Sequence, residues 1–173
     1  MGELRMSKLI DTYGREHRNL RVSLTDRCSL RCTYCMPNDF AAWIPNDDLL
    51  TTNELLTVIE VAVEQGINEV RLTGGEPLLR PDIVEIVDRI AGLAYAPRLT
   101  LTTNGLKLKE LALPLAKAGL NRINISLDTL SRERFKKLTY RDRFDDVIEG
   151  LHAAKAAGLF PIKVNTVLLQ GIN

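Results

Sequence analysis

Five short strand-like segments alternate with helical ones along this chain, and this alternation constrains the fold more than any other feature. The strand-like segments are 20–24, 69–73, 98–102, 121–127 and 161–169. Thr51 and Glu54 have the spacing of a capping box, so the first helix is expected to begin there and to stop at Gly66. The later helices are expected to open at Pro81 and to cover 108–118 and 144–157. Repeated βα units with short connections indicate a parallel sheet with right-handed crossovers.

Apolar and polar residues alternate within each strand-like segment, as in Val70, Arg71 and Leu72. A parallel strand covered on both faces would be apolar throughout, so we expect the helices on one face of the sheet only. Crossovers of one hand achieve this when the sheet curls into a barrel or partial barrel, whose lumen the polar face lines. The polar face could instead be the solvent side of an open sheet. Three cations on it, Arg21, Arg71 and Lys163, favour a lumen that binds an anion, in particular a phosphate.

The expected fold is therefore α/β, a partial parallel (βα) barrel with five strands present. The chain has 173 residues, which is room for about one domain. We divide it into an N-terminal extension over 1–19 and the partial barrel over 20–173. Five strands are too few to close an eight-stranded barrel. We expect the barrel to be incomplete at its C-terminus, and the chain to be the N-terminal part of a longer protein.

The charge balance and the N-terminus argue against several classes of protein. Lys plus Arg is 23 and Asp plus Glu is 22, which leaves a net charge of +1 and no reason to expect nucleic acid or an anionic membrane as a partner. The basic run over 132–143 is interrupted by Glu133 and Asp142, and we interpret it as a solvated face. The N-terminus has no apolar signal-peptide core, and no apolar run is long enough to cross a membrane. We expect a cytoplasmic protein.

All three cysteines, Cys28, Cys32 and Cys35, follow the first predicted strand with the spacing C-x3-C-x2-C. In a reducing compartment such a cluster indicates metal chemistry rather than disulfides. Three thiolates can hold three corners of a 4Fe-4S cluster and leave the fourth iron open for another ligand. A zinc site is the alternative, but structural zinc prefers four ligands, and neither His17 nor His152 has a suitable spacing.

The segment CSLRCTYC, residues 28–35, resembles the signature of the radical S-adenosylmethionine (SAM) superfamily, which has an aromatic residue before its third cysteine. The GGEP sequence over 74–77 resembles the superfamily's glycine-rich motif. Its glycines would let the backbone approach a ligand, and Glu76 could pair with an ammonium. The resemblance implies that the open iron binds SAM, whose cleavage gives a 5′-deoxyadenosyl radical. The cofactor-binding residues expected here are Tyr34, Gly74, Gly75, Glu76, Asn104 and Ser126.

Longer stretches resemble one family within the superfamily, the GTP 3′,8-cyclases of molybdenum-cofactor biosynthesis. They include RLTGGEPLLRPD, LTTNG and RINISLDTL, and the resemblance covers about 11–173. It implies conversion of GTP to 3′,8-cyclo-7,8-dihydro-GTP by a lyase. The GTP contacts that it implies are Arg21, Arg71, Thr102 and Lys163. The partners that it implies are an electron donor, the downstream cyclic pyranopterin monophosphate synthase and a second copy in a homodimer.

The chain also departs from this family. Residues 38–40 and 138–140 differ from the family pattern, the latter reading Leu-Thr-Tyr where Thr-Gly is common; both departures lie in predicted loops. The family's C-terminal half, with a second 4Fe-4S cluster that binds guanine, is not in this sequence. We therefore expect the chain alone to cleave SAM slowly without cyclising GTP. Two alternatives stay open: another radical SAM enzyme that modifies a peptide or protein, and a non-catalytic module that binds a 4Fe-4S cluster and SAM.

Overall fold

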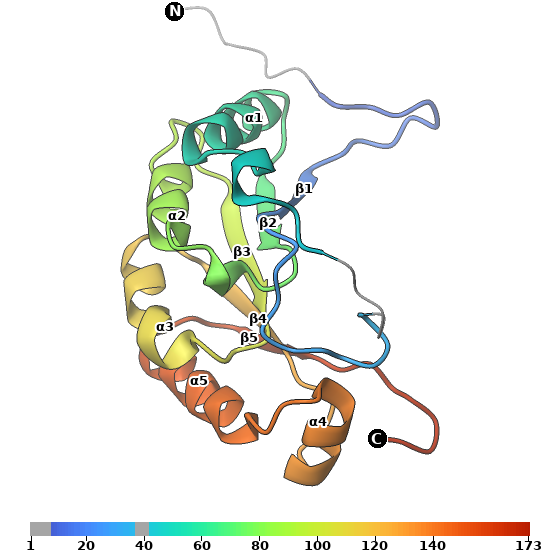
Figure 1. The fold of residues 1–173 in the computed structure, drawn as a ribbon. Coiled ribbons are helices and arrows are strands. Elements are labelled where there is room, and N and C mark those ends of the chain that lie inside the picture. The colour runs from blue at the N-terminus through green and yellow to red at the C-terminus, as the bar shows by residue number, and fades with distance from the viewer. Residues whose placement is uncertain (1–7, 37–41) are drawn as a thin grey trace, which may run out of the picture.

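A computed structural model describes residues 8–36 and 42–173, and in them five parallel strands form one sheet in the order β1-β2-β3-β4-β5 (Figure 1). The strands are β1 Asn19–Ser23, β2 Glu69–Thr73, β3 Arg98–Thr103, β4 Arg122–Ser126 and β5 Ile162–Asn165. The α-helices are α1 Thr52–Glu64, α2 Ile83–Ala91, α3 Leu108–Lys117, α4 Arg132–Thr139 and α5 Phe144–Ala156. Two short 3-10 helices are η1 Asn46–Asp48 and η2 Pro77–Leu79. The expected α/β fold with an unclosed parallel sheet is confirmed.

Local chemistry explains where the elements begin and end. The Thr51 hydroxyl accepts from the Glu54 backbone N–H, and the Glu54 carboxylate accepts from that of Thr51, so the capping box predicted for α1 is present. Gly66, predicted to end this helix, follows it with a φ of 97°, a conformation that favours glycine. The start predicted for α2 at Pro81 is wrong by two residues, because Asp82 is the N-cap and the helix begins at Ile83.

The predicted fifth strand, 161–169, is too long, since β5 covers only Ile162–Asn165. Beyond Asn165 the chain turns to the end of β4: the Thr166 hydroxyl donates to the Leu127 carbonyl oxygen, and the Val167 N–H donates to the Asp128 carboxylate. These two bonds replace the sheet ladder.

Helix α4 was not predicted as a separate helix.

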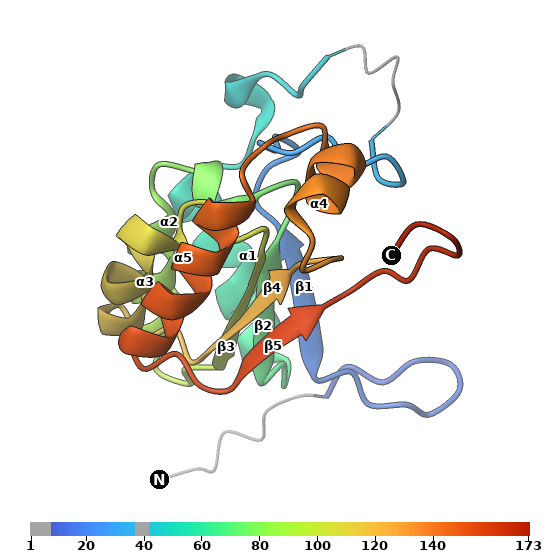
Figure 2. The same cartoon turned by 90° about the horizontal axis from the view of Figure 1, so that it is seen from below.

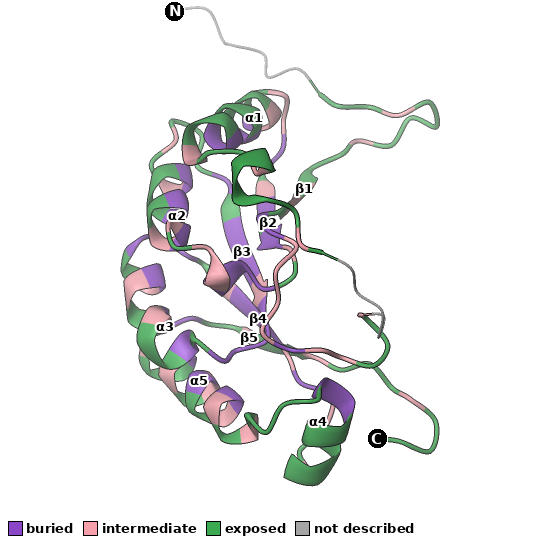
Figure 3. Ribbon diagram, in the orientation of Figure 1, coloured by how far each residue is buried: buried purple, intermediate pink, exposed green. Residues whose placement is uncertain are grey.

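Helices α1, α2, α3 and α5 cover one face of the sheet, whereas α4 lies beyond the carboxyl ends of the strands (Figures 1 and 2). The covered face is apolar, and its central side chains have no exposed area: Val70, Leu72, Leu99, Leu101, Ile123 and Ile125 (Figure 3). On the other face, Arg21, Arg71 and Lys163 are exposed. The one-sided arrangement predicted from strand alternation is therefore confirmed.

The remaining parts of the chain lie outside this sheet. Residues 8–18 form a turn closed by an antiparallel bridge between Ile10 and Glu16 (Figure 1). Residues 1–7, and the departure at 38–40, lie outside the described residues. No helix in the described part of the chain is long and apolar enough to cross a membrane.

Candidate functional site

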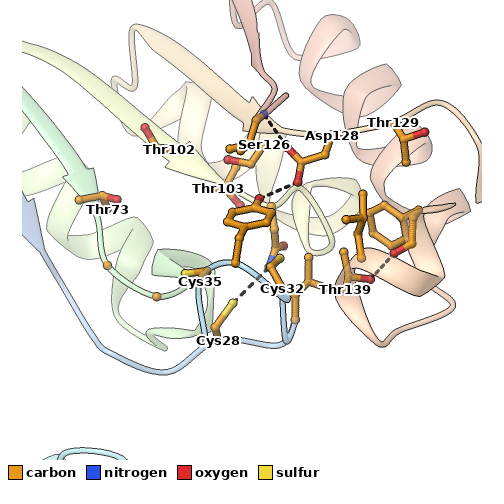
Figure 4. Close-up of a pocket in the computed structure, with 18 of the residues that line it drawn as sticks. Cys28, Cys32, Cys35, Thr73, Thr102, Thr103, Ser126, Asp128, Thr129 and Thr139 are labelled. Atoms are coloured by element: carbon orange, nitrogen blue, oxygen red, sulfur yellow. Dashed lines mark hydrogen bonds between the residues drawn. The ribbon is translucent and has the colours of Figure 1, made fainter. Parts of the chain in front are cut away.

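A pocket of about 270 Å³ opens at the carboxyl ends of the strands, where the cysteine loop, residues 28–35, crosses the sheet (Figure 4). The carboxyl ends of parallel strands meet at one edge, and loops that follow different strands come together there. All three cysteines line the pocket, together with Tyr34 and the first two residues of the glycine loop, 74–77. Thr102 of β3 and Ser126 of β4, with Asn104 and Asp128 just after these strands, complete much of its wall.

Two of the three thiols are partly shielded from solvent. Cys28 and Cys32 are half-buried and Cys35 is exposed. Burial raises the pKa of Cys28, and burial together with the neighbouring Cys28 raises the pKa of Cys32 to about 11. These two thiols are therefore protonated at neutral pH in the free protein, and a metal must displace their protons to bind.

The three thiols face a shared hollow without converging on one point. Among residues 8–36 and 42–173, no three Cys, His, Asp or Glu side chains are placed to hold a single metal ion. A structural zinc ion needs four ligands around one centre, whereas the irons of a 4Fe-4S cluster are spread over a cube and each thiolate reaches a different one. This donor set fits the cluster better than zinc.

The cysteine loop is fixed by the end of α4. The Arg31 N–H donates to the Thr139 carbonyl oxygen at 3.0 Å, and the Thr33 N–H donates to that of Leu138 at 2.9 Å. The departure at 138–140 was expected to lie in a loop away from the site, and this is wrong. Leu138 and Thr139 lie in the last turn of α4, and their otherwise unpaired carbonyl groups hold the cysteine loop.

Tyr34 closes one side of the pocket. Its hydroxyl donates to the Asp128 carboxylate at 2.6 Å, and burial followed by this bond raises the pKa of Tyr34. The other Asp128 oxygen accepts from the Val167 N–H at 2.9 Å. Asp128 thus joins the cysteine loop, the end of β4 and the segment after β5. Sequence reasoning assigned Asp128 no role, because the contact partners lie 94 and 39 residues away along the chain.

The glycine loop is packed against the start of the cysteine loop. A Cβ added to Gly74 would lie 2.3 Å from the Thr25 carbonyl oxygen, and one added to Gly75 would lie 2.3 Å from those of Asp26 and Arg27. Gly74 also has a φ of 144°, which side chains rarely tolerate. On the side where a Cβ would stand, the space is filled by the chain's own backbone, while both glycines also line the pocket, so their backbone contact with a ligand stays a prediction.

Glu76 is not in the pocket wall, and its side chain is only 2% exposed. One carboxylate oxygen accepts from the Thr103 hydroxyl at 2.6 Å and the Leu78 N–H at 3.0 Å; the other accepts from the Asn104 N–H at 2.7 Å. Burial raises the pKa of Glu76, and these hydrogen bonds oppose it. Glu76 thus joins the loops after β2 and β3, and the pairing of its carboxylate with a ligand's ammonium stays a prediction.

The predicted cations lie on the polar face at different distances from the cysteines. Arg21 lines the cysteine pocket and also a smaller hollow of about 110 Å³ that it shares with Arg71. Arg71 donates to Glu69 at 3.2 Å. Lys163 is exposed and lines neither hollow, although its strand partner Asn124 donates to the Thr102 hydroxyl at 3.3 Å. The structure thus brings Arg21 and Thr102 to the cysteines directly.

One further cation was missed. The sheet register places Arg21, Arg71, Thr100 and Arg122 side by side, and we call these four the arginine row. Two buried atoms of the row, the Thr100 hydroxyl oxygen and Arg122 Nε, have no hydrogen-bond partner among the described residues. The alternation in β4 could have identified Arg122, since it precedes Ile123 and shares a face with Asn124.

The radical SAM superfamily model matches residues 22–173, which hold the three cysteines, the glycine loop and every other residue just described except Arg21. The chain belongs to the radical SAM superfamily. Membership implies a 4Fe-4S cluster and SAM, and the cysteine pocket brings the three thiols together with several hydroxyl and amide side chains.

Individual relatives narrow the comparison. The chain is 58% identical over 166 residues to the GTP 3′,8-cyclase of Streptomyces coelicolor, an alignment that covers 95% of this chain and 49% of that protein. It is 49% identical to molybdenum cofactor biosynthesis protein 1 of Mus musculus, covering 95% of this chain and 26% of that protein. The chain therefore spans about half the length of the bacterial relative.

Several solved structures share the fold. SuiB of Streptococcus suis, bound to its precursor peptide SuiA, matches with a TM-score of 0.74 at 21% identity, over 88% of this chain and 33% of that one. Methylornithine synthase matches with a TM-score of 0.69 at 20% identity, over 90% of this chain and 45% of that one. At these identities the likeness shows a common fold alone.

Proposed function

We propose that this chain forms the cluster- and SAM-binding part of a GTP 3′,8-cyclase, which converts GTP to 3′,8-cyclo-7,8-dihydro-GTP in molybdenum-cofactor biosynthesis. The observation that carries the proposal is the position of Arg21, which lines both the cysteine pocket and the hollow at the arginine row. A ligand bound in one is therefore adjacent to a ligand bound in the other. The relatives named GTP 3′,8-cyclase support the choice of reaction.

In this proposal the cysteine loop is the cofactor site. Cys28, Cys32 and Cys35 would hold a 4Fe-4S cluster as thiolates, with SAM beside it. The cluster and SAM would supply radical chemistry at the ribose of GTP. The protein's part is to position the two: the pocket wall offers the Ser126 hydroxyl, the Gly75 backbone and the Tyr34 side chain to SAM.

The polar face is the GTP site in this proposal. Arg21, Arg71 and Lys163 supply charge for the triphosphate and Thr102 a hydroxyl, and Arg122 adds a cation that the resemblance did not include. Each charge-assisted hydrogen bond contributes about 1.5–3 kcal/mol. A row of cations suits a triphosphate better than an uncharged peptide, which favours a cyclase over the alternative of a peptide-modifying enzyme.

Paired binding measurements test this assignment. Arg71→Ala or Lys163→Ala should weaken GTP binding to the reconstituted protein by roughly ten- to a hundredfold and leave SAM binding nearly unchanged. Lys117→Ala, on the exposed side of α3, is the matched control and should change neither. Equal loss of both ligands in Arg71→Ala and Lys163→Ala would contradict the proposal, because it would mean that these side chains support the fold.

A further inference from the structure

The Asn104 carboxamide stands between the cysteine pocket and the loops behind it. Its Nδ2 lies 3.9 Å from the Cys28 Sγ and donates to the Ser29 hydroxyl at 3.1 Å. Its Oδ1 accepts from the Leu106 N–H at 3.1 Å. Because a backbone N–H occupies the oxygen, the orientation of the amide is settled, and the NH₂ group is the end that faces Cys28. Asn104 is only 8% exposed, so water does not compete freely for this position.

Glu76 fixes the backbone from which this amide extends. Its carboxylate accepts from the Asn104 N–H and from the neighbouring Thr103 hydroxyl. The Glu76 N–H in turn donates to the Arg27 carbonyl oxygen at 2.7 Å, one residue before Cys28. The same residue therefore holds both the donor and the sulfur that it faces. Glu76 does not itself reach the thiol, so it is a positioning residue.

We propose that Asn104, held by Glu76, donates a hydrogen bond to the Cys28 thiolate of the bound cluster and raises its reduction potential. The inference rests on the proposed cluster site. Adding an electron puts more negative charge on the cluster and its sulfur ligands, so a donor aimed at a ligating sulfur stabilises the reduced form more than the oxidised one. The residue expected from the superfamily resemblance to contact SAM would thus act on the cluster as well.

The test is the midpoint potential of the reconstituted cluster in the full chain, measured by anaerobic redox titration with electron paramagnetic resonance. Asn104→Ala removes the donor. At a fixed solution potential its ratio of reduced to oxidised cluster should fall about tenfold, which is about 59 mV for a one-electron couple. Glu76→Gln should shift the ratio in the same direction by less, since it weakens the support and leaves the amide in place.

Two further variants separate loss of the Cys28 contact from loss of the Ser29 contact and from misfolding. Ser29→Ala removes the other acceptor of the Asn104 NH₂ group but leaves the Cys28 contact, so its potential should equal that of the wild type. Asn104→Ser is smaller and polar but too short to reach Sγ, and it should reproduce the drop if Asn104→Ala fails to fold. Folded Asn104 variants with full iron content and an unchanged potential would overturn the inference. A wild-type chain that takes up no cluster would instead overturn the proposed function on which it rests.

Discussion

The two faces of the sheet differ in almost every physical property. On the helix-covered face, the side chains of β2, β3 and β4 are fully buried aliphatics such as Leu101. On the other face, the same strands present cations and hydroxyls, and some of their polar atoms are buried without a hydrogen-bond partner among the described residues, as at Thr100. Successive residues of one strand supply both faces. Stability therefore comes mainly from one face, which leaves the side chains of the other available for ligands.

The largest expected effect separates the two faces directly. Leu101→Ala removes a fully buried side chain and should lower the free energy of unfolding by about 2–5 kcal/mol. Lys163→Ala, on the exposed face, should change it by less than about 0.5 kcal/mol while weakening GTP binding. Urea unfolding measures the free energy of unfolding of both variants, and GTP titration measures their affinity for GTP. Comparable losses of stability in Leu101→Ala and Lys163→Ala would contradict the conclusion that stability comes mainly from the helix-covered face.

The second effect concerns the contact between the glycine loop and the start of the cysteine loop. Gly75→Ala would place a methyl group 2.3 Å from the Asp26 and Arg27 carbonyl oxygens. Overpacking of this kind costs about 1–3 kcal/mol, and the cysteine loop must shift to relieve it, so iron bound per chain should fall. Gly92→Ala is the matched control, since its nearest contact would be an ordinary 3.4 Å from the Asp88 carbonyl oxygen. Unchanged iron content in a folded Gly75→Ala protein would show that the loop contact is dispensable.

The third effect depends on pH and concerns the ion pair between Arg80 and Asp82. Burial raises the pKa of Asp82, but hydrogen bonds from Arg80 and Thr52 outweigh it and leave the pKa lowered. Arg80 also donates to the Leu24 and Leu50 carbonyl oxygens, so the pair fixes the end of β1.

A lowered carboxyl pKa means that Asp82 stabilises the fold above its unfolded-state pKa, and that this contribution disappears as pH falls through the folded-state value. Asp82→Asn should cost about 1 kcal/mol or less at pH 7, given solvent screening. The difference from the wild type should shrink below about pH 4. Urea unfolding at several pH values measures it. A difference that grew as the pH fell would reverse the assigned sign.

The smallest effect is a gain in stability. Tyr140 ends α4 with a φ of 53°, a left-handed conformation that costs an ordinary residue about 1–2 kcal/mol. Tyr140→Gly should therefore stabilise the protein, by about 1 kcal/mol at most, since glycine also loses more entropy on folding. Thermal unfolding measures the gain. Tyr140→Ala removes the same ring but keeps the strain, and a matching gain there would point to the side chain instead of the backbone.

Sequence reasoning predicted what local pattern determines. Strand alternation predicted the two faces, and the cysteine spacing predicted a cluster of thiols, which the fold brings to one pocket. It failed where partners are far apart in sequence. The acceptor roles of Glu76 and Asp128 depend on loops that only the folded sheet brings together, and the end of β5 is set by contacts with β4. The alternation of apolar and polar residues in β4 indicates that Arg122 lies on the polar face, but the sequence analysis did not include it.

The most direct test of the account is anaerobic reconstitution of this chain with iron and sulfide, followed by addition of SAM. We expect about four irons and four sulfides per chain. We also expect that the electron paramagnetic resonance spectrum of the reduced cluster changes when SAM binds the open iron. Cys32→Ser, the control, should hold no such cluster. Stoichiometric zinc without sulfide in protein purified without oxygen, or a cluster whose spectrum ignores SAM, would contradict the central claim.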